Sequence, residues 1–171
     1  MIPVCIQTLI VSPIPAPSIL VLCPESDYGK EETCRIVPIM MGVPEATQLG
    51  IALEGSKLKR PMTHDLFLDA LTNLDTTVDR VEIYDVDGKV FFARLVLRTG
   101  NRIIELDARP SDAISLAIRQ NAPIYMTEEV LRKASYPFIF RKGADPQKEM
   151  EDFHAFVQNL DPNDFLENPE E

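Results

Sequence analysis

Two glycine turns, Asp87-Gly88 and Gly100-Asn101, divide a long stretch of β-branched and aromatic residues into three runs. An Asp-Gly pair between such runs is a strong hairpin signal, because its residues accept the positive φ angles of tight hairpin turns. Residues 78–107 are therefore predicted to form a three-stranded antiparallel meander. A chain with this meander folds around a sheet, and its other segments must extend or cover that sheet.

Strand-like and helix-like segments flank the meander. Apolar residues recur at helical spacing after Pro44 and again after Thr63. The first of these helices should end near Glu54, because Gly55 suits a left-handed cap. Strands are predicted at 4–11, 19–23, 34–41 and 123–126, and a further short helix after Thr127. These elements together make one α+β domain.

A further helix is predicted to start at Pro110, where a missing N–H costs nothing in the first turn. It is apolar on most sides, with a narrow polar stripe of Asp112, Ser115 and Arg119 at helical spacing. We therefore expect this helix to be largely buried.

The net charge of −10 is concentrated in the last part of the chain. Residues 145–171 hold nine acidic residues and one base, which leaves 18 acids and 16 bases for residues 1–144. Nucleic-acid binders usually carry a basic surface, because neutralising phosphates supplies most of their non-specific affinity. The acidity of the whole chain counts against such a partner, but the nearly neutral main domain does not exclude one.

The N-terminal segment is apolar but has no basic leader, and Pro13, Pro15 and Pro17 interrupt the residues that follow it. It matches neither a signal peptide nor a membrane span, so we expect a cytoplasmic protein with no membrane partner. The three cysteines lack C-x-x-C spacing and are expected to be reduced. Because there is no glycine-rich phosphate loop, no nucleotide cofactor is expected.

The segment from Asp107 to Asp112, between the last strand of the meander and the following helix, carries most of the candidate chemistry. Asp107 and Asp112 offer carboxylates to a hard cation, and Arg109 offers a planar fork to phosphate oxygens. The alternatives are a structural network, in which Arg109 pairs with Asp107 and Asp112 complements the helix dipole, and a simple anion site at this helix start.

Three other groups of polar residues are candidates. His64, with Asp65 beside it at a helix start, can act as a general base or position a water. Lys57, Lys59 and Arg60 form a basic segment that can contact phosphates. Glu45 can add a further carboxylate. For each of these groups the alternative is an ordinary solvated or helix-stabilising role.

Several separated motifs together resemble the bifunctional nuclease domain family. They are Val37-Pro-Ile-Met-Met-Gly42 with Glu45, Leu53-Glu-Gly55, Arg60-Pro-Met-Thr-His-Asp-Leu66, Asp107-Ala-Arg-Pro-Ser-Asp-Ala113 and Ala122-Pro-Ile124. The resemblance implies an α+β fold with a mixed, largely antiparallel sheet and helices packed against it. It also implies a homo-oligomer and activity on both DNA and RNA. We expect this domain to span residues 1–136, followed at 137–171 by an acidic extension with one amphipathic helix.

The resemblance also implies roles for the individual residues at the motif positions. A nuclease of this kind would use His64, Asp65 and Arg109 in catalysis, Lys57, Lys59 and Arg60 in substrate binding, and Glu45, Asp107 and Asp112 as ligands of Mg²⁺ or Mn²⁺. The alternative is a non-catalytic homo-oligomeric binding module in which the same residues form a structural network.

Overall fold

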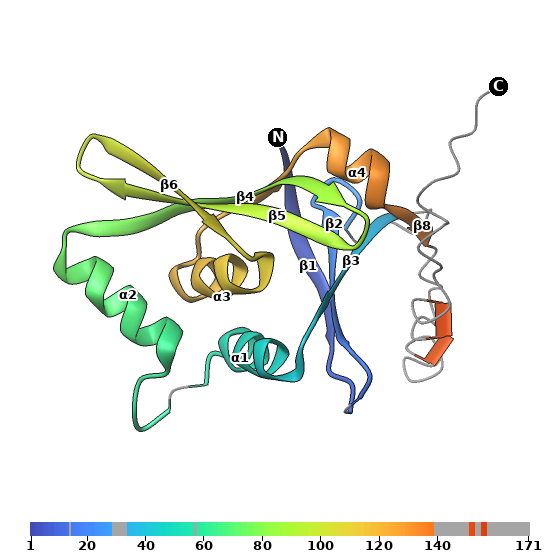
Figure 1. Ribbon diagram of the computed structural model, residues 1–171, viewed down its shortest axis with the longest axis horizontal. Coiled ribbons are helices and arrows are strands. Elements are labelled where there is room, and N and C mark those ends of the chain that lie inside the picture. The colour runs from blue at the N-terminus through green and yellow to red at the C-terminus, as the bar shows by residue number, and fades with distance from the viewer. Residues whose placement is uncertain (14, 29–33, 57, 139–150, 153–154, 157–171) are drawn as a thin grey trace.

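The computed structural model describes residues 1–13, 15–28, 34–56, 58–138, 151–152 and 155–156 (Figure 1). In chain order the elements are β1 (Ile2–Ile10), β2 (Ser18–Pro24), β3 (Cys34–Met41), α1 (Val43–Leu53), α2 (Thr63–Asn73), β4 (Thr76–Asp87), β5 (Val90–Thr99), β6 (Arg102–Ala108), α3 (Pro110–Gln120), β7 (Ile124–Met126), α4 (Glu128–Ala134) and β8 (Tyr136–Phe138). The predicted meander and the helix starts near Pro44, Thr63, Pro110 and Thr127 are confirmed.

Within this part of the chain the sheet has eight strands, in the order β6-β5-β4-β7-β1-β2-β3-β8. Of the described pairs, only β4 and β7 run parallel, and the others are antiparallel. The short strand β7 joins the two halves, since Ile124 pairs with Val81 on one side and with Val4 on the other. The expected α+β fold with a mixed, largely antiparallel sheet is confirmed.

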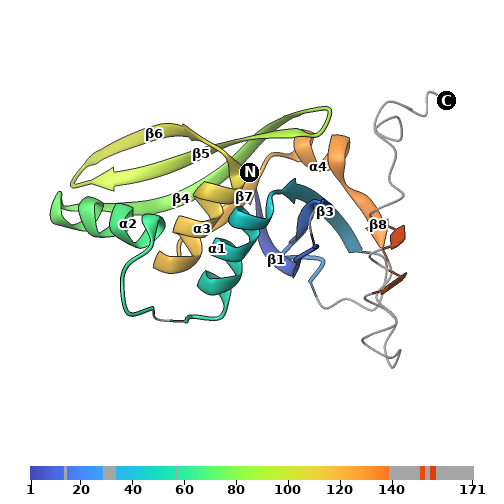
Figure 2. The ribbon, with the colours of Figure 1, turned by 60° about the horizontal axis from the view of Figure 1, so that its bottom comes forward.

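Helices α1, α2 and α3 cover one face of this sheet (Figures 1 and 2). α3 is the central helix, and its Ala113, Ile114 and Ala117 have no exposed surface. They pack in one core cluster with strand residues such as Val81 and Ile83. The prediction that this helix is largely buried is confirmed.

The opposite face of β1, β2 and β3 carries a second, smaller apolar cluster. Val21 and Ile36 lie in it, and Tyr136, Phe138 and Phe156 pack against them. The ring of Phe156 is 6.0 Å from that of Tyr136, measured between centroids. Aromatic residues from the end of the chain therefore cover a sheet face that the three helices leave open.

The predicted domain boundary at residue 136 falls inside β8. This strand pairs with β3, so the sheet continues to Phe138. In the predicted extension, residues 151–152 and 155–156 are helical, and most of its other residues lie outside the described part of the chain.

None of the helices that the structure describes has both the length and the apolar character needed to cross a bilayer.

Candidate functional site

The first turns of three helices meet at one cluster of polar side chains. Glu45 lies in the first turn of α1, His64 in that of α2, and Asp112 in that of α3, where Arg109 is the residue before the helix. Helix N-termini carry a partial positive charge from their unpaired N–H groups. The fold therefore places acidic side chains and the N-terminal ends of three helices in one cluster.

Arg109 connects these helices. Its Nε and Nη2 atoms donate to Asp112 Oδ2 and Oδ1 at 2.8 and 3.3 Å, and its Nη1 donates to Glu45 Oε1 at 3.1 Å. The Arg109 side chain is nevertheless 65% exposed, compared with 24% for Glu45. A solvent-facing guanidinium with a planar set of donors is suited to bind an incoming oxyanion.

His64 lies on the other side of Asp112. Its Nε2 atom is 3.6 Å from Asp112 Oδ1, the oxygen that also accepts from Arg109, and only 15% of its side chain is exposed. Burial of the ring, followed by the charge of Arg119, lowers the pKa of His64, and the nearby carboxylates of Asp112 and Asp65 oppose this shift. The ordinary pKa of histidine is about 6.5. His64 is therefore neutral at pH 7 and can accept a proton.

Asp65, for which a catalytic role is predicted, is held by two hydrogen bonds beside His64. Its Oδ2 accepts from the backbone N–H of Met62 at 2.9 Å, and its Oδ1 accepts from Arg119 Nε at 2.8 Å. These bonds, that to Met62 first, lower the pKa of Asp65. Arg119 also donates to the backbone oxygens of Ser115 and Gln48, at 3.0 and 3.3 Å. The pair ties α1, α2 and α3 together beside His64.

Replacing Arg119 with methionine is expected to lower the free energy of unfolding by about 2 kcal/mol or more, since hydrogen bonds to charged groups contribute about 1.5–3 kcal/mol. The Arg119 side chain is only 10% exposed. In the variant, Asp65 and the backbone oxygens of Ser115 and Gln48 therefore lose a hydrogen-bond donor that water does not easily replace. Urea unfolding measures the change. The matched control is Arg98→Met, because Arg98 is 51% exposed and pairs with Asp79 on the surface. Equal losses in both variants would contradict the prediction.

Asp107, one of the expected metal ligands, does not join the cluster. Side chains alternate along β6, so Ile104 and Ala108 face the helices and Asp107 is exposed on the opposite face. There it lies opposite Arg94 of β5. The pair expected between Arg109 and Asp107 is likewise replaced by the pairs with Asp112 and Glu45.

A metal site is not assembled by the described residues in this arrangement. No group of three or more His, Cys, Asp or Glu side chains that could hold a metal ion occurs among them. The two carboxylates that do converge, Glu45 and Asp112, both bind the guanidinium of Arg109. The residues present thus fit an anion-binding arginine better than a cation site.

The predicted basic segment lies apart from Arg109. Lys57 is outside the described residues, and the exposed Lys59 and Arg60 do not line the groove beside Arg109. The lysine that does line it is Lys89, at the tip of the hairpin between β4 and β5. The sequence signalled the hairpin through Asp87-Gly88, but not that its tip folds back toward the start of α3.

This groove, which we call the Arg109 groove, has a volume of about 260 Å³. It is lined by residues that include Gly42, Glu45, Lys89, Phe91, Arg109 and Pro110. A Cβ atom on Gly42 would lie 2.5 Å from Glu45 Oε2, so glycine leaves the room that this carboxylate occupies. The groove combines two cations, one carboxylate and an aromatic side chain.

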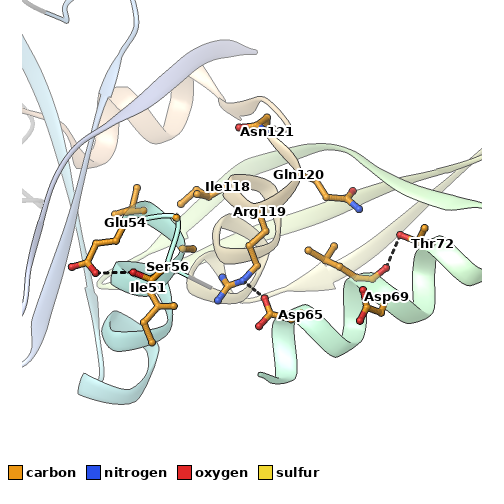
Figure 3. A pocket seen from close by; sticks show the side chains of 14 residues that line it. Ile51, Glu54, Ser56, Asp65, Asp69, Thr72, Ile118, Arg119, Gln120 and Asn121 are labelled. Atoms are coloured by element: carbon orange, nitrogen blue, oxygen red, sulfur yellow. Dashed lines mark hydrogen bonds and ion pairs between the residues drawn. The ribbon is translucent and has the colours of Figure 1, made fainter. Parts of the chain in front are cut away.

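A larger cleft of about 680 Å³ lies between the C-terminal ends of α1 and α3 and one side of α2 (Figure 3). Glu54, Asp65 and Asp69 line it together with Arg119, whose pair with Asp65 is drawn there. Arg109 is not part of its lining, and His64 and Asp112 line neither this cleft nor the Arg109 groove, which they adjoin through the pair of Asp112 with Arg109. With three carboxylates against one arginine, this cleft disfavours a phosphate group, so the candidate site is the Arg109 groove.

Comparisons with known proteins identify the family of this chain. Residues 29–138 match the family model described as bifunctional nuclease domain. An uncharacterized protein of Mycobacterium tuberculosis is 32% identical over 136 residues, which are 77% of this chain and 81% of that protein. Bifunctional nuclease 1 of Oryza sativa subsp. japonica is 28% identical over 98 residues, which are 56% of this chain and 30% of that protein.

Proposed function

Because the chain belongs to the bifunctional nuclease domain family, we propose that it hydrolyses phosphodiester bonds in DNA and RNA at the Arg109 groove. The observation that carries the proposal is the set of contacts linking Glu45, Arg109, Asp112 and His64, in which an exposed arginine and a largely buried histidine lie beside the same carboxylate.

Arg109 is the phosphate-binding residue. In the structure the N–H groups of Arg109 donate to Asp112 and Glu45. When a phosphodiester binds, one of its phosphate oxygens replaces one of these carboxylates as the acceptor. Lys89 lines the same groove and adds a second positive charge. Preorganised donors of this kind stabilise the negative charge that develops on the phosphorus oxygens during attack.

His64 is the proton acceptor for the attacking water. Nε2 is the ring nitrogen on the side of Arg109, because it lies beside the carboxylate that Arg109 binds. The other nitrogen, Nδ1, is buried and has no hydrogen-bond partner in the described part of the chain. Asp112 then stabilises the imidazolium that forms when His64 takes the proton. Asp112 thus holds the base and the phosphate-binding group in one arrangement.

Dependence on Mg²⁺ or Mn²⁺ stays a prediction of the sequence. The geometry supports the roles of Arg109, His64 and Asp112 without assigning ligands to a cation. Assays with each metal ion and with a chelator therefore belong to the test of the proposed function.

The test is cleavage of DNA and RNA by purified protein carrying Asp112→Asn. We expect a loss of about 100-fold or more, as when one charge-stabilising group is removed from an active site. The control is Asp107→Asn, an acid of the same segment that faces away from the groove. Full activity in Asp112→Asn, or equal loss in both variants, would refute the proposed site. Activity that survives the chelator would refute metal dependence alone.

A second candidate function is a non-catalytic binding module that assembles as a homo-oligomer. It is favoured by the way Arg109 already satisfies both converging carboxylates, which a purely structural network would also show. On this reading Asp112→Asn lowers the stability of the fold, and neither the wild-type chain nor any variant cleaves nucleic acid.

A further inference from the structure

The wall of the Arg109 groove opposite the helices is apolar and aromatic. Along β5, Ala93, Leu95 and Leu97 face the helices and are buried in the core cluster. Phe91 continues this face toward the hairpin tip, where it is only half-buried and lines the groove. Val90, beside it, is 60% exposed. An aromatic side chain is thus presented next to the two cations of the groove.

Phe92 points the other way. Its ring lies on the opposite face of the sheet, 6.4 Å from the ring of Tyr84 between centroids. Phe92 is 36% exposed, so two consecutive aromatic residues present surface on opposite faces of one strand. Only Phe91 lines the Arg109 groove.

We propose that the Arg109 groove binds one unstacked nucleotide of a single-stranded nucleic acid, with its base against Phe91 and Val90 and its phosphate between Arg109 and Lys89. This inference rests on the proposed function and names its substrate class. Bases stack on aromatic side chains in sequence-tolerant single-strand sites, while basic residues follow the backbone. In a duplex the base faces are covered by their neighbours, so a duplex offers the groove its phosphates without the stacking contact.

The volume and the charges of the groove fit this occupant. About 260 Å³ accommodates one nucleotide but not a helix, whose backbone would have to enter between the hairpin tip and the start of α3. Lys89 and Arg109 bring two positive charges to the groove, where Glu45 is the one carboxylate of the lining, and Asp112, outside the lining, also pairs with Arg109. Both α1 and α3 begin at the groove, and the N-terminal ends of helices favour a bound phosphate.

Binding by the full chain tests the proposal without turnover. Fluorescence anisotropy in EDTA, with strand integrity checked on a gel, compares a labelled oligothymidylate, an abasic strand of equal length, and a duplex of equal length. We expect the oligothymidylate to bind at least about 5-fold more tightly than the abasic strand, as one stacked base provides. The duplex should bind no better than the abasic strand.

Two variants locate the effect. Phe91→Leu keeps an apolar side chain against the core and should remove most of the preference for the strand with bases, whereas Phe92→Leu should retain it. Lys89→Gln should weaken the binding of all strands equally. It should also reduce the magnitude of the slope of log K against log salt concentration by about 0.7. Lys133→Gln is its control, since Lys133 pairs with Glu129 on α4.

Equal affinity for the abasic strand and the strand with bases, or an unchanged preference in Phe91→Leu, would overturn the inference. These binding results do not depend on cleavage. If these binding results fail but cleavage still requires Asp112, the proposed function is retained and the single-nucleotide groove is refuted. If the base preference depends on Phe91 but no variant loses cleavage, the single-nucleotide groove is supported and the proposed catalytic role of the site is refuted.

Discussion

Replacing Arg109 with glutamine is expected to reduce kcat/KM for cleavage of nucleic acid by at least about 100-fold, because the proposed function assigns this guanidinium to the reacting phosphate. The change should have little effect on the stability of the fold. Arg109 is 65% exposed, and surface ion pairs contribute only about 0–1 kcal/mol. Loss of activity without loss of stability is the signature that separates a phosphate-binding arginine from a structural one.

Steady-state cleavage assays and urea unfolding on the same protein measure both quantities. Arg98→Gln is the matched control, because Arg98 is also an exposed arginine paired with a carboxylate, 2.6 Å from Asp79. Arg109→Lys should recover only part of the activity, since lysine keeps the charge but not the planar fork. A fully active Arg109→Gln variant would exclude Arg109 from catalysis.

Replacing His64 with glutamine is expected to reduce kcat by about 10²- to 10⁴-fold, the range in which a positioned acid–base group contributes. Burial and the charge of Arg119 lower the pKa of His64, so in the wild-type protein the proposed base should stay neutral down to a pH below about 6.5. The pH–rate profile measures this acidic limb. Arg119→Met should move the limb to higher pH, because one cause of the lowered pKa is removed.

The same lowered pKa gives the stability of the fold a pH dependence of known sign. Below about pH 6.5 the unfolded chain binds a proton at His64 more readily than the folded chain does, so the contribution of this group to stability falls as the pH falls. Urea unfolding at pH 7.5 and pH 5 should show a smaller difference in His64→Gln than in wild type. His154→Gln serves as the control for the other histidine. An equal effect of the two substitutions would contradict the assignment.

Much of the local structure followed from residue patterns. The hairpin turns, the helix starts and the buried character of α3 were all predicted from spacing and turn chemistry. The polar stripe of α3 was also informative, since Asp112 contacts His64 and Arg119 contacts Asp65. These features depend on neighbours a few residues away, and short-range sterics and hydrogen bonding are nearly the same in any fold.

The expected metal ligands show what residue patterns within one segment did not predict. Closeness along the chain placed Asp107 with Asp112, but strand alternation turns Asp107 to the opposite face, and Arg109 binds Glu45, 64 residues away, instead. Asp65, which is expected in catalysis, accepts a hydrogen bond from Arg119, 54 residues away. No pattern within a single segment marks either partner.

The sequence by itself determined most of the strands and helices, although not β8, and it determined which face of these elements is apolar and which family the chain resembles. Only the tertiary structure decided that β7 enters between β1 and β4, that the first turns of α1, α2 and α3 meet at Arg109, and that the hairpin tip brings Lys89 and Phe91 beside it. Periodicity specifies the face of one element, because it arises from the geometry of the backbone. Which faces meet depends on how distant strands pair and how the helices pack over them to bury apolar surface.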